Sequence, residues 1–258
     1  MNELEQLERN RVTKANQLAR ATYDLTLDEQ RLLFLAISKI NSPEIDHYKE
    51  KGAQGELILV NGTPISTFET TPFSVSAKEY SQIFGVGINS AYTQIKRAAS
   101  KLKGRVITRL DGDVVEEINW TYKRRYIEKE GRIEIFFSRD LEEFLTNISG
   151  NFSTYQIKEI AKFKLKHTIK VFEYLKSLDP RKCLHKIEIG QLKIILALDT
   201  KSNESFGNFD SKILQPALME INAGCSSMQV EYKKIKTGRS VTHIEFQVLD
   251  TSRDRVSE

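Results

Sequence analysis

The sequence predicts an α+β protein in which one order of elements occurs twice along the chain. In each half, a short alternating strand precedes two helical patterns separated by a turn or loop, and two alternating stretches joined by turn residues follow them. Capping residues and glycines mark the element ends. A strand, helix, turn, helix and β-hairpin in this order form a winged helix-turn-helix. We therefore expect two tandem winged-helix domains, at residues 1–149 and 150–258, with the boundary near Ser149 and Gly150.

A long helical stretch is expected before the first winged-helix pattern. It spans residues 16–40, in which Thr26 and Glu29 have the spacing of a capping box and a broad apolar face follows them. Glycine and proline residues indicate a loop over residues 41–72. Within that loop, the apolar residues 57–60 fit a short edge strand.

The first winged-helix pattern begins at Phe73. Ser76 and Glu79 form a second capping box, and the helix after the turn has one apolar face and one polar, basic face. The expected elements are a strand at 73–76, a helix from 76 to about 84, a turn at 85–87, a helix capped by Asn89 and ending near Lys103, and strands at 106–110, 114–122 and 132–137.

The second pattern repeats this order without close residue identity. The expected elements are a strand at 152–157, a helix at 166–178, a strand at 186–189, a helix at 191–198, a helix capped by Asn208 and ending near Asn222, and strands at 228–234 and 241–248. Pro216 removes one backbone donor inside the last helix and crowds the carbonyl group of Lys212. Either the regular helix starts near Leu214, or the helix is kinked at the proline.

Composition and charge restrict the class of protein. The chain has 258 residues, of which 40% are hydrophobic and 29% charged, so a disordered chain is excluded. No apolar run approaches the ~18 residues of a membrane span, the first dozen residues lack the apolar core of a secretory signal, and two cysteines do not form a disulfide framework. We expect a cytoplasmic protein without a membrane partner.

Basic residues are grouped, although the net charge is only +4. The formal charge is −1 before residue 150 and +5 after it, and residues 96–109 and 233–239 contain no acidic residue. Short polar and basic side chains on an exposed helix can read the major groove, and cations on a hairpin can bind phosphate. The candidate DNA-binding residues are Ser90, Tyr92, Thr93, Lys96, Arg97, Lys101, Arg124, Arg125, Asn208, Ser211, Lys212, Gln215, Lys233, Lys234, Lys236 and Arg239.

The chain lacks the motifs of common catalytic sites. No glycine is followed by lysine, so there is no P-loop, and four scattered histidines give no His-x-His metal pair. Tyr122, Tyr126 and Tyr155 have no residue nearby in sequence that would activate them. We expect no catalysis, no metal and no cofactor.

Four stretches resemble the iteron-binding, theta-type plasmid replication initiators. Residues 16–33 are similar to the opening helix of that family, and residues 171–175, 213–222 and 236–246 match its later motifs in the same order. A proline in the second recognition helix is usual in the family. Some members carry consecutive arginines early in that helix, whereas this chain has Phe209, Asp210, Ser211 and Lys212.

The resemblance implies two winged-helix domains that bind double-stranded direct repeats, the iterons, at a plasmid origin. It also implies a monomer that starts replication and a dimer, formed mainly through the N-terminal domain, that represses its own promoter or restrains copy number. Host replication initiator, helicase and chaperone proteins are the other implied partners. The C-terminal domain is expected to be the principal iteron-binding domain.

Three other functions fit parts of the pattern. A winged-helix transcription regulator without a replication role would share the DNA-binding residues. A DNA-nicking relaxase would use a tyrosine nucleophile. A protein-interaction module would use its winged helices to bind a protein partner, and Lys96 and Arg97 would then not affect DNA binding.

Overall fold

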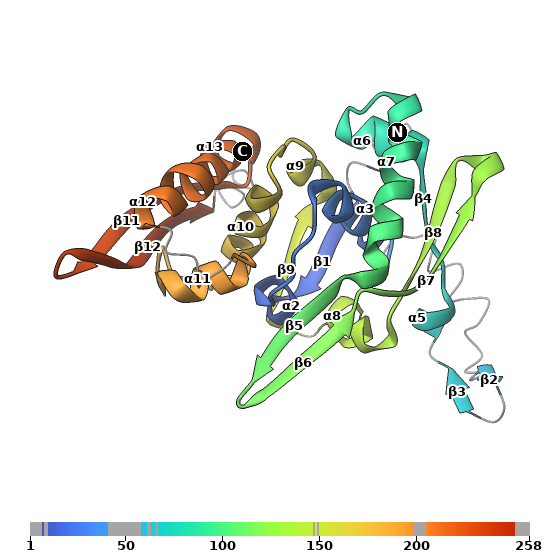
Figure 1. Cartoon of the computed structure of the whole chain (residues 1–258), viewed down its shortest axis with the longest axis horizontal. Coiled ribbons are helices and arrows are strands. Elements are labelled where there is room, and N and C mark those ends of the chain that lie inside the picture. Colours follow the sequence, from blue (N-terminus) through green and yellow to red (C-terminus); the bar gives the residue numbers. More distant parts are fainter. Residues whose placement is uncertain are drawn as a thin grey trace.

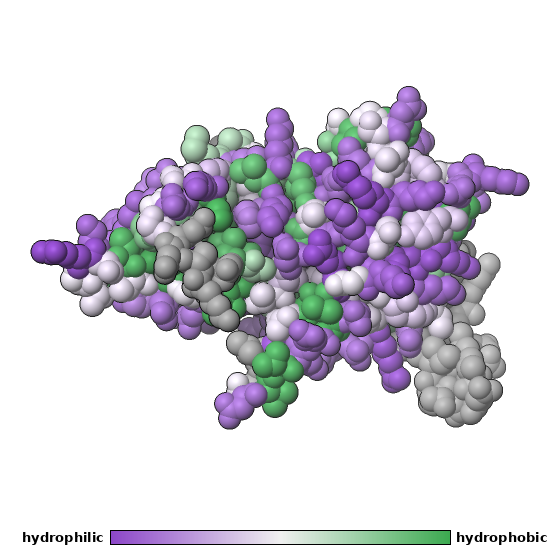
Figure 2. Space-filling view, in the orientation of Figure 1, coloured by the Kyte–Doolittle hydropathy of each residue, from purple (hydrophilic) through white to green (hydrophobic). Residues whose placement is uncertain are grey.

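The computed structural model describes residues 7, 10–40, 58–60, 63–65, 67–146, 148, 150–198 and 205–250. The molecule is elongated, and an N-terminal and a C-terminal unit lie next to each other along its long axis (Figure 1). Hydrophilic side chains gather at the tip of the β11–β12 hairpin and over much of the half that contains α7 (Figure 2). No helix in the described ranges is long and apolar enough to cross a membrane.

The N-terminal unit is a helix-turn-helix on a three-stranded sheet. Its sheet is antiparallel with the order β4-β8-β7, and α7 contacts α3, α6 and β8. Its elements are α3 (Leu27–Ile37), β4 (Phe73–Ser76), α6 (Ala77–Phe84), α7 (Ile88–Lys101), β7 (Thr121–Ile127) and β8 (Arg132–Phe137).

The C-terminal unit has the same topology. Its antiparallel sheet has the order β10-β12-β11, so in both units the third strand lies between the first and the second. Its elements are α10 (Lys166–Lys176), β10 (Leu184–Glu188), α11 (Ile189–Ile195), α12 (Phe206–Phe209), the π-helix η4 (Asp210–Leu214), α13 (Gln215–Gly224), β11 (Met228–Thr237) and β12 (Ser240–Asp250). The predicted fold class, two winged-helix units of α+β type, is confirmed.

A strand from each unit joins the two units. β1 (Arg11–Ala15) pairs antiparallel with β9 (Phe152–Gln156), and Thr13 lies opposite Thr154 with their hydroxyl oxygens 3.0 Å apart. α2 (Asn16–Arg20) follows β1 and contacts α10, whereas α9 (Ile157–Ala161) follows β9 and contacts α3. Each of these two short helices therefore contacts the other unit. The ladder crosses the predicted boundary at residues 149 and 150, which stays a prediction.

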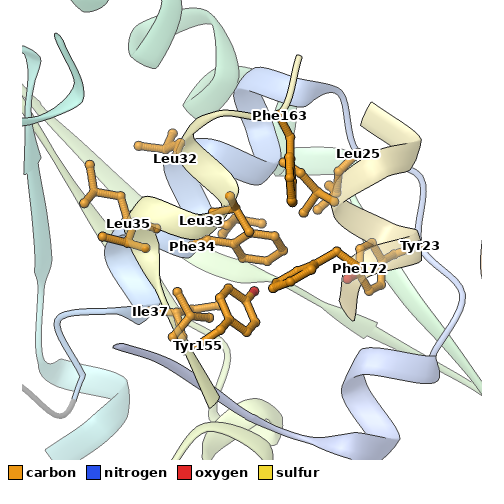
Figure 3. Packing of buried hydrophobic residues seen from close by; sticks show 14 of the residues in the cluster. Tyr23, Leu25, Leu32, Leu33, Phe34, Leu35, Ile37, Tyr155, Phe163 and Phe172 are labelled. Carbon is orange, nitrogen blue, oxygen red and sulfur yellow. The ribbon is translucent and has the colours of Figure 1, made fainter. Parts of the chain in front are cut away.

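One hydrophobic core extends through both units. Phe34 from α3, Tyr155 from β9 and Phe172 from α10 converge on the same space (Figure 3). All three are buried, as is Phe163 in the loop before α10. Arg31 of α3 adds a hydrogen bond, since its Nη2 donates to the carbonyl oxygen of Phe163 at 2.9 Å. The two units are therefore packed together rather than connected by a linker alone.

Ionisable side chains are buried where β1, β9 and α10 meet. Glu173 accepts hydrogen bonds from the hydroxyl groups of Tyr23 at 2.6 Å and Tyr155 at 2.7 Å, and it forms an ion pair with Lys14. Nearby, Nζ of Lys170 donates to two backbone carbonyl groups, at 2.7 and 3.1 Å. Burial lowers the pKa of both lysines and raises the pKa of both tyrosines. One carboxylate thus holds side chains from both units.

The single helix predicted over residues 16–40 is wrong. α2 ends at Arg20, and α3 begins only after Thr26, whose side chain forms the predicted capping box with Glu29. The backbone between the two helices forms tertiary contacts instead. Thr22 forms a β-bridge with Thr108, and the carbonyl groups of residues 19 and 21 accept hydrogen bonds from Nζ of Lys170. These contacts replace helical hydrogen bonds.

The strand predicted over residues 114–122 is also wrong in extent. The chain changes sheet at Trp120, whose side chain is buried, so β6 (Val114–Asn119) pairs with β5 (Val106–Asp111) as a separate ribbon while β7 pairs with β8. The predicted strand at 57–60 is present as β2, but the rest of the predicted loop at 41–57 lies outside the described residues. The remaining elements are β2 (Ile58–Val60), β3 (Thr63–Ile65), α5 (Thr67–Thr70), α8 (Glu142–Leu145) and the 3-10 turns η1 (Leu102–Gly104), η2 (Glu128–Glu130) and η3 (Arg139–Leu141).

Candidate nucleic-acid interface

Helix α7 has the two faces that the sequence predicts. Its alanines and Ile95 are buried against α3 and α6, while the polar and basic side chains point to solvent. The exposed candidates are Ser90, Thr93, Lys96, Arg97 and Lys101. These side chains therefore form one accessible polar and cationic surface on the second helix of the helix-turn-helix.

Two expectations for α7 are corrected by the structure. Asn89 is not the N-cap, because Gly87 occupies that position and Asn89 lies in the first turn. Tyr92 is half-buried: its ring packs against the core, and its hydroxyl group is buried without a hydrogen-bond partner in the described part of the chain. Tyr92 therefore supports the helix from beneath and does not present its hydroxyl group outward.

Two of the cations on α7 are already paired within the unit. Nζ of Lys96 lies 2.6 Å from Oε1 of Glu128 in the turn between β7 and β8. Nη2 of Arg97 lies 2.9 Å from Oδ2 of Asp28 in the first turn of α3. The hydrogen bond with Lys96 lowers the pKa of Glu128 and raises that of Lys96. Both cations remain exposed, so a phosphate group could reach them.

The candidates on β7 are less free. Nε of Arg125 donates to Oε2 of Glu134 on β8 at 2.6 Å, and Arg132 pairs with the same carboxylate. Arg124 is half-buried and donates to the hydroxyl group of Thr121 at 2.9 Å. These contacts stabilise the hairpin, while the exposed side of Arg125 can still face a ligand.

The second recognition helix is continuous from Phe206 to Gly224. Ser205, not Asn208, caps it, because the Ser205 hydroxyl group accepts from the backbone N–H of Asn208. The predicted cap is therefore wrong. Four candidate side chains are exposed along the first half of this helix: Asn208, Ser211, Lys212 and Gln215.

A π-helical turn accommodates Pro216. The N–H group of Gln215 donates to the carbonyl oxygen of Asp210, five residues earlier, and regular α-helix begins at Gln215 with the proline in its first turn. The first turn of an α-helix tolerates proline because the missing N–H would have no regular partner there. The structure thus places the start of the regular helix close to Leu214, as one of the two alternatives expected.

Asp210 points into the fold and not toward a ligand. The residue is 4% exposed, and its carboxylate accepts from the Tyr232 hydroxyl group, from Nζ of Lys234 at 2.6 Å and from Nε2 of Gln215 at 3.1 Å. The hydrogen bond to this carboxylate raises the pKa of Lys234. Asp210 therefore ties the recognition helix to strand β11.

The β11–β12 hairpin lies at one end of the molecule (Figure 1), and hydrophilic side chains cover its tip (Figure 2). The strands pair from Met228 to Thr237, and Gly238 turns the chain with a φ of 60°, which suits glycine. Lys233, Lys236 and Arg239 are exposed, and none has an acidic partner within ion-pair distance among the residues that the structure describes. Their charges are available to a polyanion.

Sequence reasoning missed the acidic partners of these cations. Asp28 lies 69 residues before Arg97, and Glu128 lies 32 residues after Lys96. Nothing local in the sequence marks either carboxylate. In the sequence, Asp210 stands out only as a departure from the arginines of the family, and its strand partner Lys234 lies 24 residues away. No group of three or more His, Cys, Asp or Glu side chains in the described ranges could hold a metal ion.

The topology, the exposed cationic helix α7 and the cationic β11–β12 hairpin define a tandem winged-helix protein of the DNA-binding class. Residues 11–176 match the family profile described as "Initiator Replication protein, WH1", and residues 188–248 match "Initiator Rep protein, WH2". The chain belongs to this family of replication initiators. The interval between the two matches follows α10, about 30 residues beyond the boundary that the sequence predicts.

Individual relatives agree with the family assignment. A "Replication initiation protein" of Escherichia coli is 25% identical over 254 residues, which cover 96% of this chain and 72% of the relative. Among solved structures, the Pi initiator protein in complex with iteron DNA is similar with a TM-score of 0.66 and 16% identity, over 95% of this chain and 99% of the other. At this identity the likeness concerns the fold.

Proposed function

We propose that this protein binds double-stranded direct repeats at a plasmid origin and thereby initiates replication of the plasmid. One observation carries the proposal: both winged-helix units, joined through the β1–β9 ladder, leave a recognition helix exposed, with three basic side chains on α7 and Lys212 on the second helix. A duplex that contacts both helices would be read at two positions. The similarity to an initiator solved with iteron DNA supports the same ligand here.

Both units would contact the DNA. In the N-terminal unit, Ser90, Thr93 and Arg97 would contact base edges, and Lys101 would contact phosphate. In the C-terminal unit, Ser211, Lys212 and Gln215 would enter the groove. Three wing cations, Lys233, Lys236 and Arg239, would bind the flanking phosphates. The C-terminal unit is proposed as the principal iteron-binding unit, because these three wing cations lack acidic partners within the described ranges.

The proposal extends to the regulation of the initiator. A monomer would bind iterons, and a dimer formed mainly through the N-terminal unit would repress its own promoter. Host replication initiator, helicase and chaperone proteins would act with the bound monomer, in the cytoplasm. The protein would act by binding alone, so supercoiled DNA incubated with it and a divalent metal should remain unnicked.

Footprinting on the DNA just upstream of the gene tests DNA recognition. Two recognition helices in successive major grooves are separated by about 10 base pairs, so protection of about two helical turns at each repeat is expected. Protection of no particular sequence would contradict the proposal. A second assay, maintenance of an origin-less plasmid that carries the gene and its repeats, separates an initiator from a transcription regulator, which would give a footprint but no maintenance.

A further inference from the structure

The cations of the candidate interface fall into two groups. Ten of the candidate side chains are lysine or arginine, and four of these are paired with carboxylates of the same chain. The paired cations are Lys96, Arg97, Arg125 and Lys234. The other six, in the part of the chain that the structure describes, have no acidic partner: Lys101, Arg124, Lys212, Lys233, Lys236 and Arg239.

Three of the acidic partners are less exposed than the cations they hold, and two of these, Asp28 and Asp210, contact a side chain of a recognition helix. The Asp28 side chain is 21% exposed and also accepts from the Tyr80 hydroxyl group, whereas Arg97 is 62% exposed. The Asp210 side chain is 6% exposed, whereas Lys234 is 41% exposed. Each unit thus has one anchored carboxylate in contact with a side chain of its recognition helix, and in each ion pair the cation is the more exposed partner.

The anchored carboxylates leave the base-reading groups partly free. Arg97 uses its Nη2 group on Asp28, and its other N–H groups can still form the two hydrogen bonds that guanine accepts. Gln215 donates one N–H to Asp210 and also interacts with the Tyr232 hydroxyl group, which leaves its amide oxygen for a base edge. A side chain held at one end in this way keeps its direction and loses less conformational entropy on binding.

We propose that Asp28 and Asp210 are specificity-determining positioning residues of the DNA interface, one in each unit. Each holds the side chains of its recognition element in the direction of the base edges and keeps one cation away from phosphate. This inference rests on the proposed function, because it assumes that these elements face DNA.

The two effects act differently on target and unrelated DNA. Binding to unrelated duplex depends on phosphate contacts and counterion release, with a slope of log affinity against log salt of about −0.9 per contact. A cation that stays with its carboxylate adds little to that slope. Binding to the target depends also on directed base contacts, so it benefits from the fixed orientation. The two carboxylates should therefore lower the affinity for unrelated DNA and raise the affinity for the target repeat.

The test measures affinity for the upstream repeat and for an unrelated duplex of equal length, with Asp28→Asn and Asp210→Asn in the full chain. Asparagine keeps the size and an acceptor oxygen but removes the charge. For each variant, one freed cation steepens the salt slope on unrelated DNA by about 0.9, which is about a fivefold gain in affinity at about 0.15 M salt. The ratio of target to unrelated affinity falls at least about fivefold.

Glu117→Gln is the matched control. Glu117 is exposed on β6, its side chain forms no hydrogen bond or ion pair with the residues that the structure describes, and its substitution changes the net charge by the same amount. Asp28→Asn is also made together with Arg97→Ala, and Asp210→Asn together with Lys234→Ala. Each acid variant should lose its effect on the slope once its cation is gone, which a general loss of folding would not produce.

The outcomes are distinct. Acid variants that behave like Glu117→Gln, or that keep their effect without the paired cation, overturn the inference even if the wild-type protein protects the repeats. A wild-type protein that prefers no sequence overturns the proposed function and the specificity role together, while the slope on unrelated DNA still reports whether the carboxylates restrain the cations.

Discussion

Removal of two cations from the C-terminal wing should weaken DNA binding in a way that depends on salt. Lys236 and Arg239 are exposed on either side of the Gly238 turn and have no acidic partner in the described part of the chain. If each contacts one phosphate, Lys236→Ala with Arg239→Ala reduces the magnitude of the salt slope by about 1.8. At about 0.15 M salt this corresponds to a loss of about 30-fold in affinity, and the curves of variant and wild type converge near 1 M.

Fluorescence anisotropy with a labelled repeat between about 0.1 and 0.5 M salt measures this slope. For the wild-type protein, the six candidate cations without an acidic partner in the described ranges give a slope of about −5, and all ten candidate cations would give about −9. Lys158→Ala with Lys182→Ala removes two exposed charges elsewhere and should leave the slope close to that of the wild type. A double wing variant that loses the same factor at every salt concentration would refute the phosphate role.

Three further predictions concern stability. Glu173→Gln leaves Lys14 without its buried partner and should cost about 3–5 kcal/mol; a change in the free energy of urea unfolding below about 1 kcal/mol would contradict the importance of the cluster. Burial lowers the pKa of His167 to about 4 from 6.5, so the unfolded state binds the extra proton first and stability falls as the pH drops from about 6.5 to 4; in thermal melts His167→Gln should lose part of this acid sensitivity, and an unchanged pH profile would exclude His167 as its source. Gly238→Ala places a side chain at a φ of 60° and should lower the free energy of unfolding by about 1 kcal/mol, which thermal melts detect as a lower melting temperature. Gly87 has no positive φ, so Gly87→Ala should cost less.

Local signals in the sequence predicted the elements whose ends are set locally. The capping boxes at Thr26 and Ser76 start helices as expected, since each uses a side chain three residues away. The glycine at position 238 marks the wing turn for the same reason. The order of elements in each unit followed from these signals together with hydrophobic periodicity.

Features that depend on distant residues could not be predicted from one sequence. The break after α2 depends on Thr108 and Lys170, which lie far along the chain from residues 19–22. The change of sheet at Trp120 depends on burial of its ring. The candidate surface itself was largely predictable, because exposure on an amphipathic helix follows from its period. The acidic residues that hold Arg97 and Lys234 could not be predicted, because folding brings each pair together from distant positions in the sequence.

The β1–β9 ladder decides which fragments of the chain can stand alone. β1 is synthesised well before its partner, which follows about 140 residues later in the chain. A fragment that stops at residue 149 lacks β9 and α10, so Val12 and Phe34 lose their cover and Lys14 its counter-charge. Such a fragment should aggregate or associate through the open strand edge. A fragment that continues through residue 176 keeps β9 paired with β1 and retains α10, so we expect it to fold where the shorter fragment does not.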